Sequence, residues 1–393
     1  MSNESTNELV VKSAPHITGA MSKKRLMQYT FIALLIITII TAIIWWPVPS
    51  PTDGQIESLA LKNVWQLPLG SLVLINALIA IGVAVGMDAL LHKVAFDSEL
   101  NIWSAAVFGL IVTLSFSLGV PSMALASDVM PIDSLTAPNA FLYVAFISLI
   151  GLVLFKKMQS LGGRKFVNPA AAAKFLVLLP FIGSVLLVKS HFAPYDAATG
   201  TGLGVPVLAG PLGGGTAPVG NNGLGSFLTY LQSCYANPLS AGTTDINQLM
   251  ILEKFHGWTG GACSLAVIVV GIALFVIARK YIKWRITVAY FVSIAVMSLV
   301  FAFVYADTDL MIRLLFEVFI GSSIFLGFFM ATDPATTPLT GIGQIIFGVG
   351  LGLLTILIQT YMNFFGGSLL ALIIMNLTVP LLDRVGIHKP FGR

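Results

Sequence analysis

Apolar residues occur in long blocks along this chain, separated by short polar stretches. Each block contains about 20 residues, the length of helix that crosses a bilayer core of roughly 30 Å. The pattern predicts an all-α integral membrane protein with about ten transmembrane helices. The predicted helices cover residues 27–46, 69–89, 102–122, 139–157, 170–189, 261–279, 285–305, 310–330, 342–361 and 366–383.

The basic residues between these blocks predict the orientation of the chain. With a cytoplasmic N-terminus, all Lys and Arg lie on the cytoplasmic side except Lys62, Lys189, Lys254 and Arg313. Because Lys and Arg collect in cytoplasmic loops, we expect a multi-pass protein of the cell membrane with both termini in the cytoplasm. The expected regions are a cytoplasmic segment (1–26), a five-helix half (27–189), an extracytoplasmic Gly- and Thr-rich loop (190–260), a second five-helix half (261–383) and a cytoplasmic tail (384–393).

The composition agrees with a membrane protein and excludes other classes. Hydrophobic residues make up 56% of the chain, charged residues 10%, and the mean hydropathy is +0.91, so there is too little charge to cover a soluble domain. A net charge of +4 is ordinary for a membrane protein and predicts no nucleic-acid partner. Cys234 and Cys263 are too few for an iron–sulfur cluster, and the five histidines lack metal-ligand spacing. The basic loops 156–165 and 279–285 are interpreted as topology determinants or as docking sites for a partner protein or lipid headgroups.

Two predicted cytoplasmic loops share a polar pattern. The sequence LGGRKFVNPAAAAKF (161–175) leads into the fifth predicted helix, and MATDPATTPLTG (330–341) leads into the ninth. Asn168 and Asp333 each precede Pro-Ala, and a capping residue followed by Pro is a helix-start signal. One interpretation is therefore that Asn168 and Asp333 only cap helices.

The second interpretation is a ligand site at two facing helix N-termini, which would present free N–H groups and positive dipole ends. Asn168 offers a donor and an acceptor, Asp333 offers acceptors, and hydroxyls come from Thr336, Thr337 and Thr340. This set suits a flavin ring, an ion or a small polar substrate. The recurring pattern also suggests two inverted five-helix halves, although the fifth and ninth helices do not occupy equivalent positions in such a repeat.

At these residues the chain resembles the family that contains the RnfD subunit of the Rnf complex and the NqrB subunit of the sodium-translocating NADH:quinone reductase. The resemblance covers nearly the whole chain. It is carried by MATDPATTPLTGIGQ, by ALIIMNLTVPLLDRVG, and by the segments at 13–27, 162–175 and 255–286. The length and the simple N-terminus favour the Rnf subunit.

The resemblance implies two flavins. One is FMN, which family members attach through its phosphate to a Thr in an outer motif D-x-x-S/T-G-A-T. This chain has Thr199 and Gly200 in place, but Thr201 stands where Ala is expected and Gly202 where the attachment Thr is expected. The FMN candidates are therefore Thr199, Thr201 and Thr216, with covalent attachment left open. The second flavin, riboflavin in related proteins, would lie near the inner face, and its candidate residues are Asn168, Asp333, Thr336, Thr337 and Arg164.

The function that follows from this resemblance is a flavin-carrying subunit of an ion-translocating oxidoreductase. Such a protein would pass electrons across the membrane and couple ferredoxin-linked chemistry to Na⁺ or H⁺ translocation. It would not be catalytic alone, because iron–sulfur and flavin partner subunits must supply the other centres. Asp333 and Lys174 are candidates for the ion path. Without the resemblance, a secondary transporter or channel with no redox cofactor, or a structural scaffold subunit, fits the pattern as well.

Overall fold

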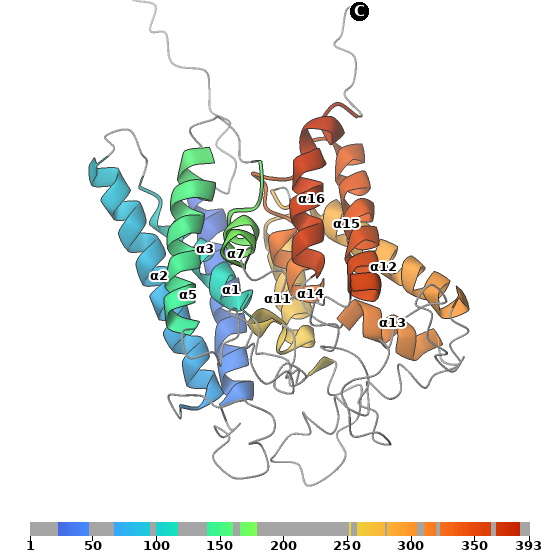
Figure 1. The fold of residues 1–393 in the computed structure, drawn as a ribbon, viewed down its shortest axis with the longest axis horizontal. Helices are drawn as coiled ribbons and strands as arrows, with labels where there is room; N and C mark the ends of the chain where they lie inside the picture. Colours follow the sequence, from blue (N-terminus) through green and yellow to red (C-terminus); the bar gives the residue numbers. More distant parts are fainter. Residues whose placement is uncertain are drawn as a thin grey trace, which may run out of the picture.

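The computed structural model describes residues 23–46, 67–94, 100–116, 140–159, 166–178, 251–252, 258–279, 281–304, 310–319, 323–362 and 367–385. All regular elements in these ranges are helices, which confirms the all-α prediction for this part of the chain (Figure 1). In chain order they are α1 (Lys23–Trp45), α2 (Leu69–Val94), α3 (Ile102–Leu114), α5 (Ala140–Ile150) continued by the π-helix η2 (Gly151–Met158), α7 (Pro169–Leu178), the 3-10 turn η5 (Thr259–Gly261), α11 (Ser264–Ile277), α12 (Trp284–Val304), α13 (Leu310–Phe319), α14 (Ser323–Phe325) continued by the π-helix η6 (Leu326–Met330), α15 (Gly341–Met362) and α16 (Gly367–Leu382).

A helix therefore lies in each of the ten ranges that the apolar blocks predicted. Among the described residues, α1, α2, α5 with η2, α12 and α15 are long and apolar enough to cross a membrane alone. The segment Ser323–Met330 is bent by 61° from Arg313–Phe319, and the two together form at most one broken span. The helices α3, α11 and α16 are shorter. The chain is thus a multi-pass membrane protein, whereas ten complete crossings remain a prediction.

The outer surface of the helical bundle is apolar, as contact with lipid requires. Leu78, Val276 and Phe303 are exposed by 71%, 72% and 75%. Hydroxyl groups inside the bundle donate to backbone carbonyls of their own helix or of a neighbour: Thr38 donates to the Leu34 carbonyl at 2.8 Å within α1, and Thr287 of α12 donates to the Gly327 carbonyl of η6 at 2.7 Å. These buried polar groups therefore have their partners within the bundle.

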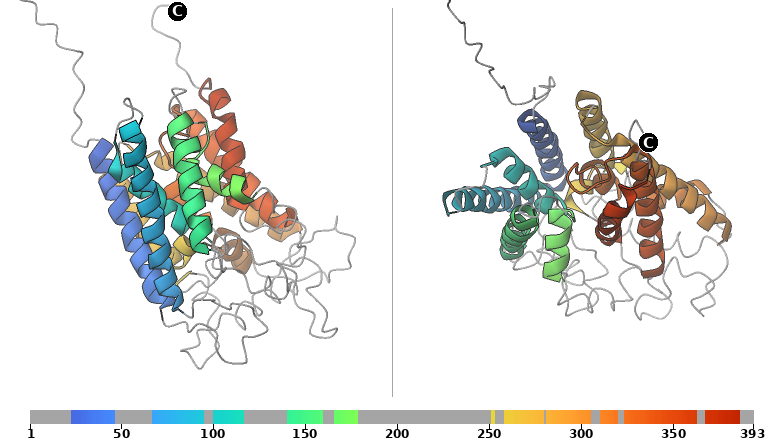
Figure 2. Two further views of the ribbon diagram at one scale, coloured as in Figure 1. Left: turned by 60° about the vertical axis from the view of Figure 1, so that its left-hand side comes forward. Right: turned by 90° about the horizontal axis from the view of Figure 1, so that it is seen from above.

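Two groups of helices pack against each other in the bundle (Figure 2). In the first group, α2 packs against α1, α3 and α5, and in the second group α15 packs against α12 and α16. The groups join where α1 contacts α11 and where α7 contacts α16. The candidates Asn168 and Asp333 line a cavity near this junction.

The first helix begins and the last helix ends at the same end of the bundle (Figure 2). Leu26 and Met27 of α1 line a cavity together with Asp333, and Asp383, just after α16, accepts a hydrogen bond from the Leu339 amide at 2.8 Å. This arrangement agrees with an even number of crossings. We call this the motif end, and its location at the cytoplasmic face remains a prediction.

A π-helix precedes each of the two polar motifs. The π-helix η2 ends ten residues before Asn168, and η6 ends three residues before Asp333. Short π-helical segments often occur at functional sites, because the extra residue per turn redirects the side chains that follow. The hydrophobic pattern did not reveal them, since a π-helix and an α-helix need equally apolar sequences.

Candidate functional site

Asn168 joins the two motifs. Its Oδ1 atom accepts hydrogen bonds from the amides of Ala170 (3.1 Å) and Ala171 (3.3 Å), so it caps the first turn of α7 as the sequence predicted. Its Nδ2 atom donates to the carbonyl of Met330 at 3.4 Å, at the end of η6. Asn168 is buried. The side chain therefore links the start of α7 to the end of η6.

Asp333 does not begin a helix, and the prediction that it caps the ninth helix is wrong. Its Oδ1 atom accepts the Ala335 amide at 3.0 Å in a turn, whereas α15 starts only at Gly341. The cap of α15 is Thr340, whose hydroxyl accepts the Gly343 amide at 3.1 Å. The physical reason is the second proline, Pro338, which disfavours helical geometry in the residue before it. The expected pair of facing helix N-termini is thus one N-terminus, of α7, facing the carbonyl end of η6.

The segment that follows Asp333, which we call the TDP loop (residues 331–340), is fastened from within and from outside. The Thr337 hydroxyl donates to the Asp333 carbonyl at 2.6 Å. The Lys283 ammonium, just before α12, donates to the carbonyls of Pro334 (3.1 Å) and Thr337 (2.9 Å) and to the Thr337 hydroxyl (2.8 Å). These bonds fix the backbone that carries Asp333.

A cavity of about 410 Å³ lies between the two motifs. Its walls come from the start of α1, from α3, η2, α7 and α11, and from the TDP loop, so both halves of the chain contribute. The lining residues are Leu26, Met27, Thr30, Ser104, Val107, Phe108, Ile111, Lys156, Asn168, Pro169, Ala170, Leu274, Tyr281, Ile282, Phe328, Phe329, Thr332, Asp333, Pro334 and Ala335. A cavity of this size, with mostly apolar walls and a few polar groups, is typical of a small-molecule site.

The polar groups of the cavity differ in what they can offer a ligand. Both acceptor positions of the Asn168 oxygen are used by α7, and one amide hydrogen is used by Met330. Asp333 uses Oδ1 for the Ala335 amide, and its second oxygen has no partner within the described part of the chain. Asp333 is therefore the main acceptor, and Asn168 contributes at most one N–H.

Lys156 is a cavity residue that the sequence did not indicate. It is buried, and its ammonium lies 5.7 Å from the centre of the Phe108 ring. The sequence analysis assigned it to a basic loop. Its position inside an apolar run, rather than after it, was the signal that it could lie within the helical bundle. The predicted helix 139–157 also contained this residue, and that assignment is confirmed, whereas a docking role on the surface does not suit a buried side chain.

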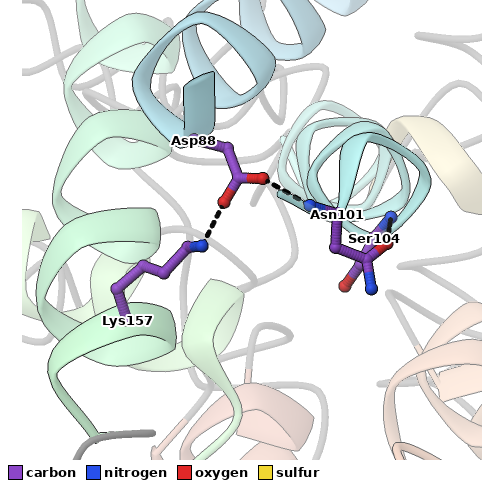
Figure 3. A network of polar contacts seen from close by, with 4 residues as sticks. All are labelled: Asp88, Asn101, Ser104 and Lys157. Carbon is purple, nitrogen blue, oxygen red and sulfur yellow. Dashed lines mark hydrogen bonds and ion pairs between the residues drawn. The ribbon is translucent and has the colours of Figure 1, made fainter. Parts of the chain in front are cut away.

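The next residue, Lys157, has a different role (Figure 3). Its ammonium pairs with the Asp88 carboxylate at 2.6 Å, and the other Asp88 oxygen accepts the Asn101 amide at 3.0 Å. Asn101 in turn caps α3 by accepting the Ser104 amide at 3.1 Å. This network ties together α2, α3 and η2 next to the cavity. Of these two consecutive lysines, Lys156 lines the cavity and Lys157 connects neighbouring helices.

The other predicted site residues lie elsewhere. Thr337 is bound up in the TDP loop and does not line the cavity. Thr336 is also outside the lining; it is buried, and its hydroxyl has no partner among the described residues. Arg164, a candidate for the inner site, lies outside the described residues. The three candidates for FMN attachment also lie outside them: Thr199, Thr201 and Thr216.

Lys174 occupies a structural position in the bundle core. Its ammonium donates to the Ser115 carbonyl, at the last turn of α3, and lies 4.9 Å from the centre of the Trp258 ring. A cation at a helix C-terminus stabilises the free carbonyls there. No group of three or more His, Cys, Asp or Glu side chains that could hold a metal ion occurs within the described ranges.

The fold and the cavity define a multi-pass helical membrane protein with a cavity of small-molecule size where α7 begins and η6 ends. The sequence matches the profile of the NQR2, RnfD, RnfE family over residues 134–392, and the chain belongs to this family. The resemblance found from the motifs is thereby confirmed.

Curated relatives cover most of the chain. The D subunit of the Na(+)-translocating ferredoxin:NAD(+) oxidoreductase complex of Acetobacterium woodii is 25% identical over 387 residues, which is 98% of this chain and 95% of the relative. The D subunit of the ion-translocating oxidoreductase complex of Shewanella amazonensis is 31% identical over 262 residues, 65% of this chain and 73% of the relative. The corresponding protein of Haemophilus ducreyi is 26% identical over 331 residues, 82% of this chain and 88% of the relative.

Proposed function

We propose that this chain is the flavin-carrying membrane subunit of an Rnf-type electron-transport complex. Its relatives are named as D subunits of ion-translocating oxidoreductase complexes, and one of those complexes acts on ferredoxin and NAD(+). In this role the chain passes electrons across the cell membrane and couples them to Na⁺ or H⁺ translocation. It works only together with iron–sulfur and flavin subunits, and both of its termini lie in the cytoplasm.

The observation that carries the proposal is the cavity beside Asp333. Its volume of about 410 Å³ lies within the range of about 300–1,000 Å³ usual for ligand pockets. An isoalloxazine ring has an apolar dimethylbenzene part and a pyrimidine edge where an N–H lies between two carbonyls. Asp333 has an oxygen to accept this N–H, and Phe108, Phe328 and Phe329 supply aromatic wall. The residues present therefore fit a flavin.

These residues position the ring and keep water away from it. Asp333 fixes the pyrimidine edge, Asn168 holds the two motifs together, and Lys283 immobilises the TDP loop. A flavin supplies a carrier that accepts electrons from one partner and passes them to another. The outer FMN and its phosphoester bond rest on the resemblance of the motif, since Thr199, Thr201 and Thr216 lie outside the described residues.

The proposal predicts that Asp333→Ala lowers the occupancy of the inner flavin. The matched control is Asp383→Ala, because Asp383 also accepts one backbone amide at the motif end, that of Leu339, but does not line the cavity. Complexes would be purified from native membranes and precipitated with acid, and the released flavin would be identified by chromatography and counted per complex. We expect loss of the released flavin in Asp333→Ala and full occupancy in Asp383→Ala.

Equal occupancy in the two variants would contradict the assignment of the cavity. Flavin that stays with the acid-precipitated protein would show covalent attachment, and peptide mapping would then decide among Thr199, Thr201 and Thr216. If the folded wild-type complex holds no flavin in either fraction, the chain is better described as a transporter without a redox cofactor.

A further inference from the structure

The cavity wall carries a buried cation, whose charge has no part in the binding role assigned above. The titratable side chains that line the cavity are Lys156 from η2, Tyr281 from the segment before α12, and Asp333 from the TDP loop. Lys156 is 9% exposed. An ammonium in an apolar cavity acts strongly on any charge that develops there, because the low dielectric constant screens it little. A lysine in this position can therefore influence a ligand whose charge changes.

We propose that Lys156 stabilises the negative charge that a flavin in this cavity acquires on reduction. This inference rests on the proposed function, because it concerns the same site. Reduction by two electrons together with one proton leaves one negative charge on the pyrimidine part of the ring, at N1 and the adjacent carbonyl. The electrons come from the donor subunits of the complex, and the proton comes from water. Lys156 then compensates the charge that a second proton would otherwise neutralise.

The local structure holds the ammonium in place for this role. Lys157 is paired with Asp88, which connects η2 to α2. Gly151, one turn earlier, lies against Phe108 so closely that a β-carbon there would clash with the ring, and Phe108 lies below the Lys156 ammonium. The π-helix sends two consecutive lysines to different partners. The position of the Lys156 charge is therefore set by packing, and this kind of preorganised charge tunes a flavin.

The opposite charge in the cavity, on Asp333, acts in the other sense and is present in the wild type and in every Lys156 variant. Asp333 belongs to a separate element, and one of its oxygens accepts the Ala335 amide. As a hydrogen-bond acceptor it suits the N–H of the ring, which is present in both redox states. Lys156 is suited to the carbonyl and N1, where the charge changes. Because Asp333 is the same in the wild type and in the Lys156 variants, the difference between their potentials reports the Lys156 charge alone.

The test is a redox titration of the inner flavin at several pH values, followed by visible absorbance in the whole complex. The inner flavin is identified as the component that the Asp333→Ala complex lacks. If its reduction takes up one proton per two electrons, the midpoint potential falls by about 30 mV per pH unit, and with two protons it falls by about 59 mV per pH unit. We expect the wild type to follow the smaller slope above a certain pH, and to change to the larger slope below it.

In Lys156→Met the change of slope should move to higher pH by at least one unit. At high pH the preference for the reduced ring should fall at least tenfold, which corresponds to a midpoint potential more negative by about 30 mV. Lys156→Arg keeps the charge and should retain the wild-type curve. Arg384→Gln removes an exposed charge at the same end of the bundle, outside the cavity. This variant should also give the wild-type titration curve.

Three results would overturn the inference. The first is a wild-type midpoint potential that falls by about 59 mV per pH unit at every pH. This result requires only the wild-type complex, so it does not depend on the folding of a variant. Another is a Lys156→Met curve that coincides with the wild type while flavin is still bound. The third is an equal shift in Arg384→Gln, which would show a general effect of surface charge. None of these results removes flavin from the cavity, so the proposed function would stand.

Discussion

Replacing Asn168 with alanine removes a helix cap and a bond between two motifs in one step. The lost cap leaves the amides of Ala170 and Ala171 without their acceptor and costs about 1 kcal/mol. The lost Nδ2 group leaves the buried Met330 carbonyl with only a long bond from the Asp333 amide, at 3.5 Å. An under-satisfied buried carbonyl costs about 1–3 kcal/mol, and the remaining bond favours the lower part of that range. We therefore expect Asn168→Ala to lower the free energy of unfolding by about 2–3 kcal/mol.

Two variants separate the cap from the bond between the motifs. Asn168→Asp keeps the acceptor for α7 and loses only the donor to Met330, so it should cost about 1–2 kcal/mol. Asn101→Ala removes a cap that bonds one amide, that of Ser104, and makes no bond to a second motif, so it should cost about 1 kcal/mol. Unfolding would be measured in mixed micelles by titration with a denaturing detergent, with helix content as the signal. If Asn168→Ala loses no more stability than Asn101→Ala, the reasoning that Asn168 joins the two motifs is refuted.

Two further predictions concern the scaffold beside the cavity. Gly151→Ala places a β-carbon against Phe108 and 2.9 Å from the Ala173 β-carbon, so overpacking should destabilise the protein by about 1–3 kcal/mol in the same titration; unchanged stability would show that η2 can move away. Asp88→Asn leaves Lys157 without its carboxylate, and we expect a loss of about 2 kcal/mol, less than for a fully buried pair because Lys157 is 20% exposed. Asp88→Asn with Lys157→Gln should recover part of this loss, and no recovery would argue against the ion pair as the cause.

The sequence predicted the places of the helices well and their inner breaks poorly. Every apolar block contains a helix, because burial in lipid requires about 20 apolar residues wherever a helix crosses. The block 102–122, however, contains α3, which is only the 13 residues Ile102–Leu114, and the block 310–330 contains two helices bent by 61°. Hydropathy is the same for a continuous helix and for a broken one. Tertiary contacts such as the bond from the Lys174 ammonium to the Ser115 carbonyl at the end of α3 are not visible in hydropathy.

The candidate site was predicted in part. Asn168 and Asp333 were found because a polar residue before proline stands out in an apolar chain, and both do line one cavity. Lys156 was missed because the positive-inside rule already explains a lysine near the end of a predicted span. Its inward direction depends on the π-helical turn of η2, which leaves no mark in the hydrophobic pattern. Thr336 and Thr337 were chosen for nearness in sequence, whereas the TDP loop turns them away from the cavity.

The two motifs are similar in sequence, but their polar residues, Asn168 and Asp333, make different hydrogen bonds. An asparagine can accept and donate at once, and Asn168 uses both functions to join α7 to η6. An aspartate can only accept, and Asp333 keeps one oxygen facing the cavity after its turn is closed. If the residues were exchanged, the joint would lose its donor and the cavity would lose its charge. The capping interpretation therefore holds for Asn168, and the ligand interpretation is the proposal for Asp333, which lines the cavity without capping a helix.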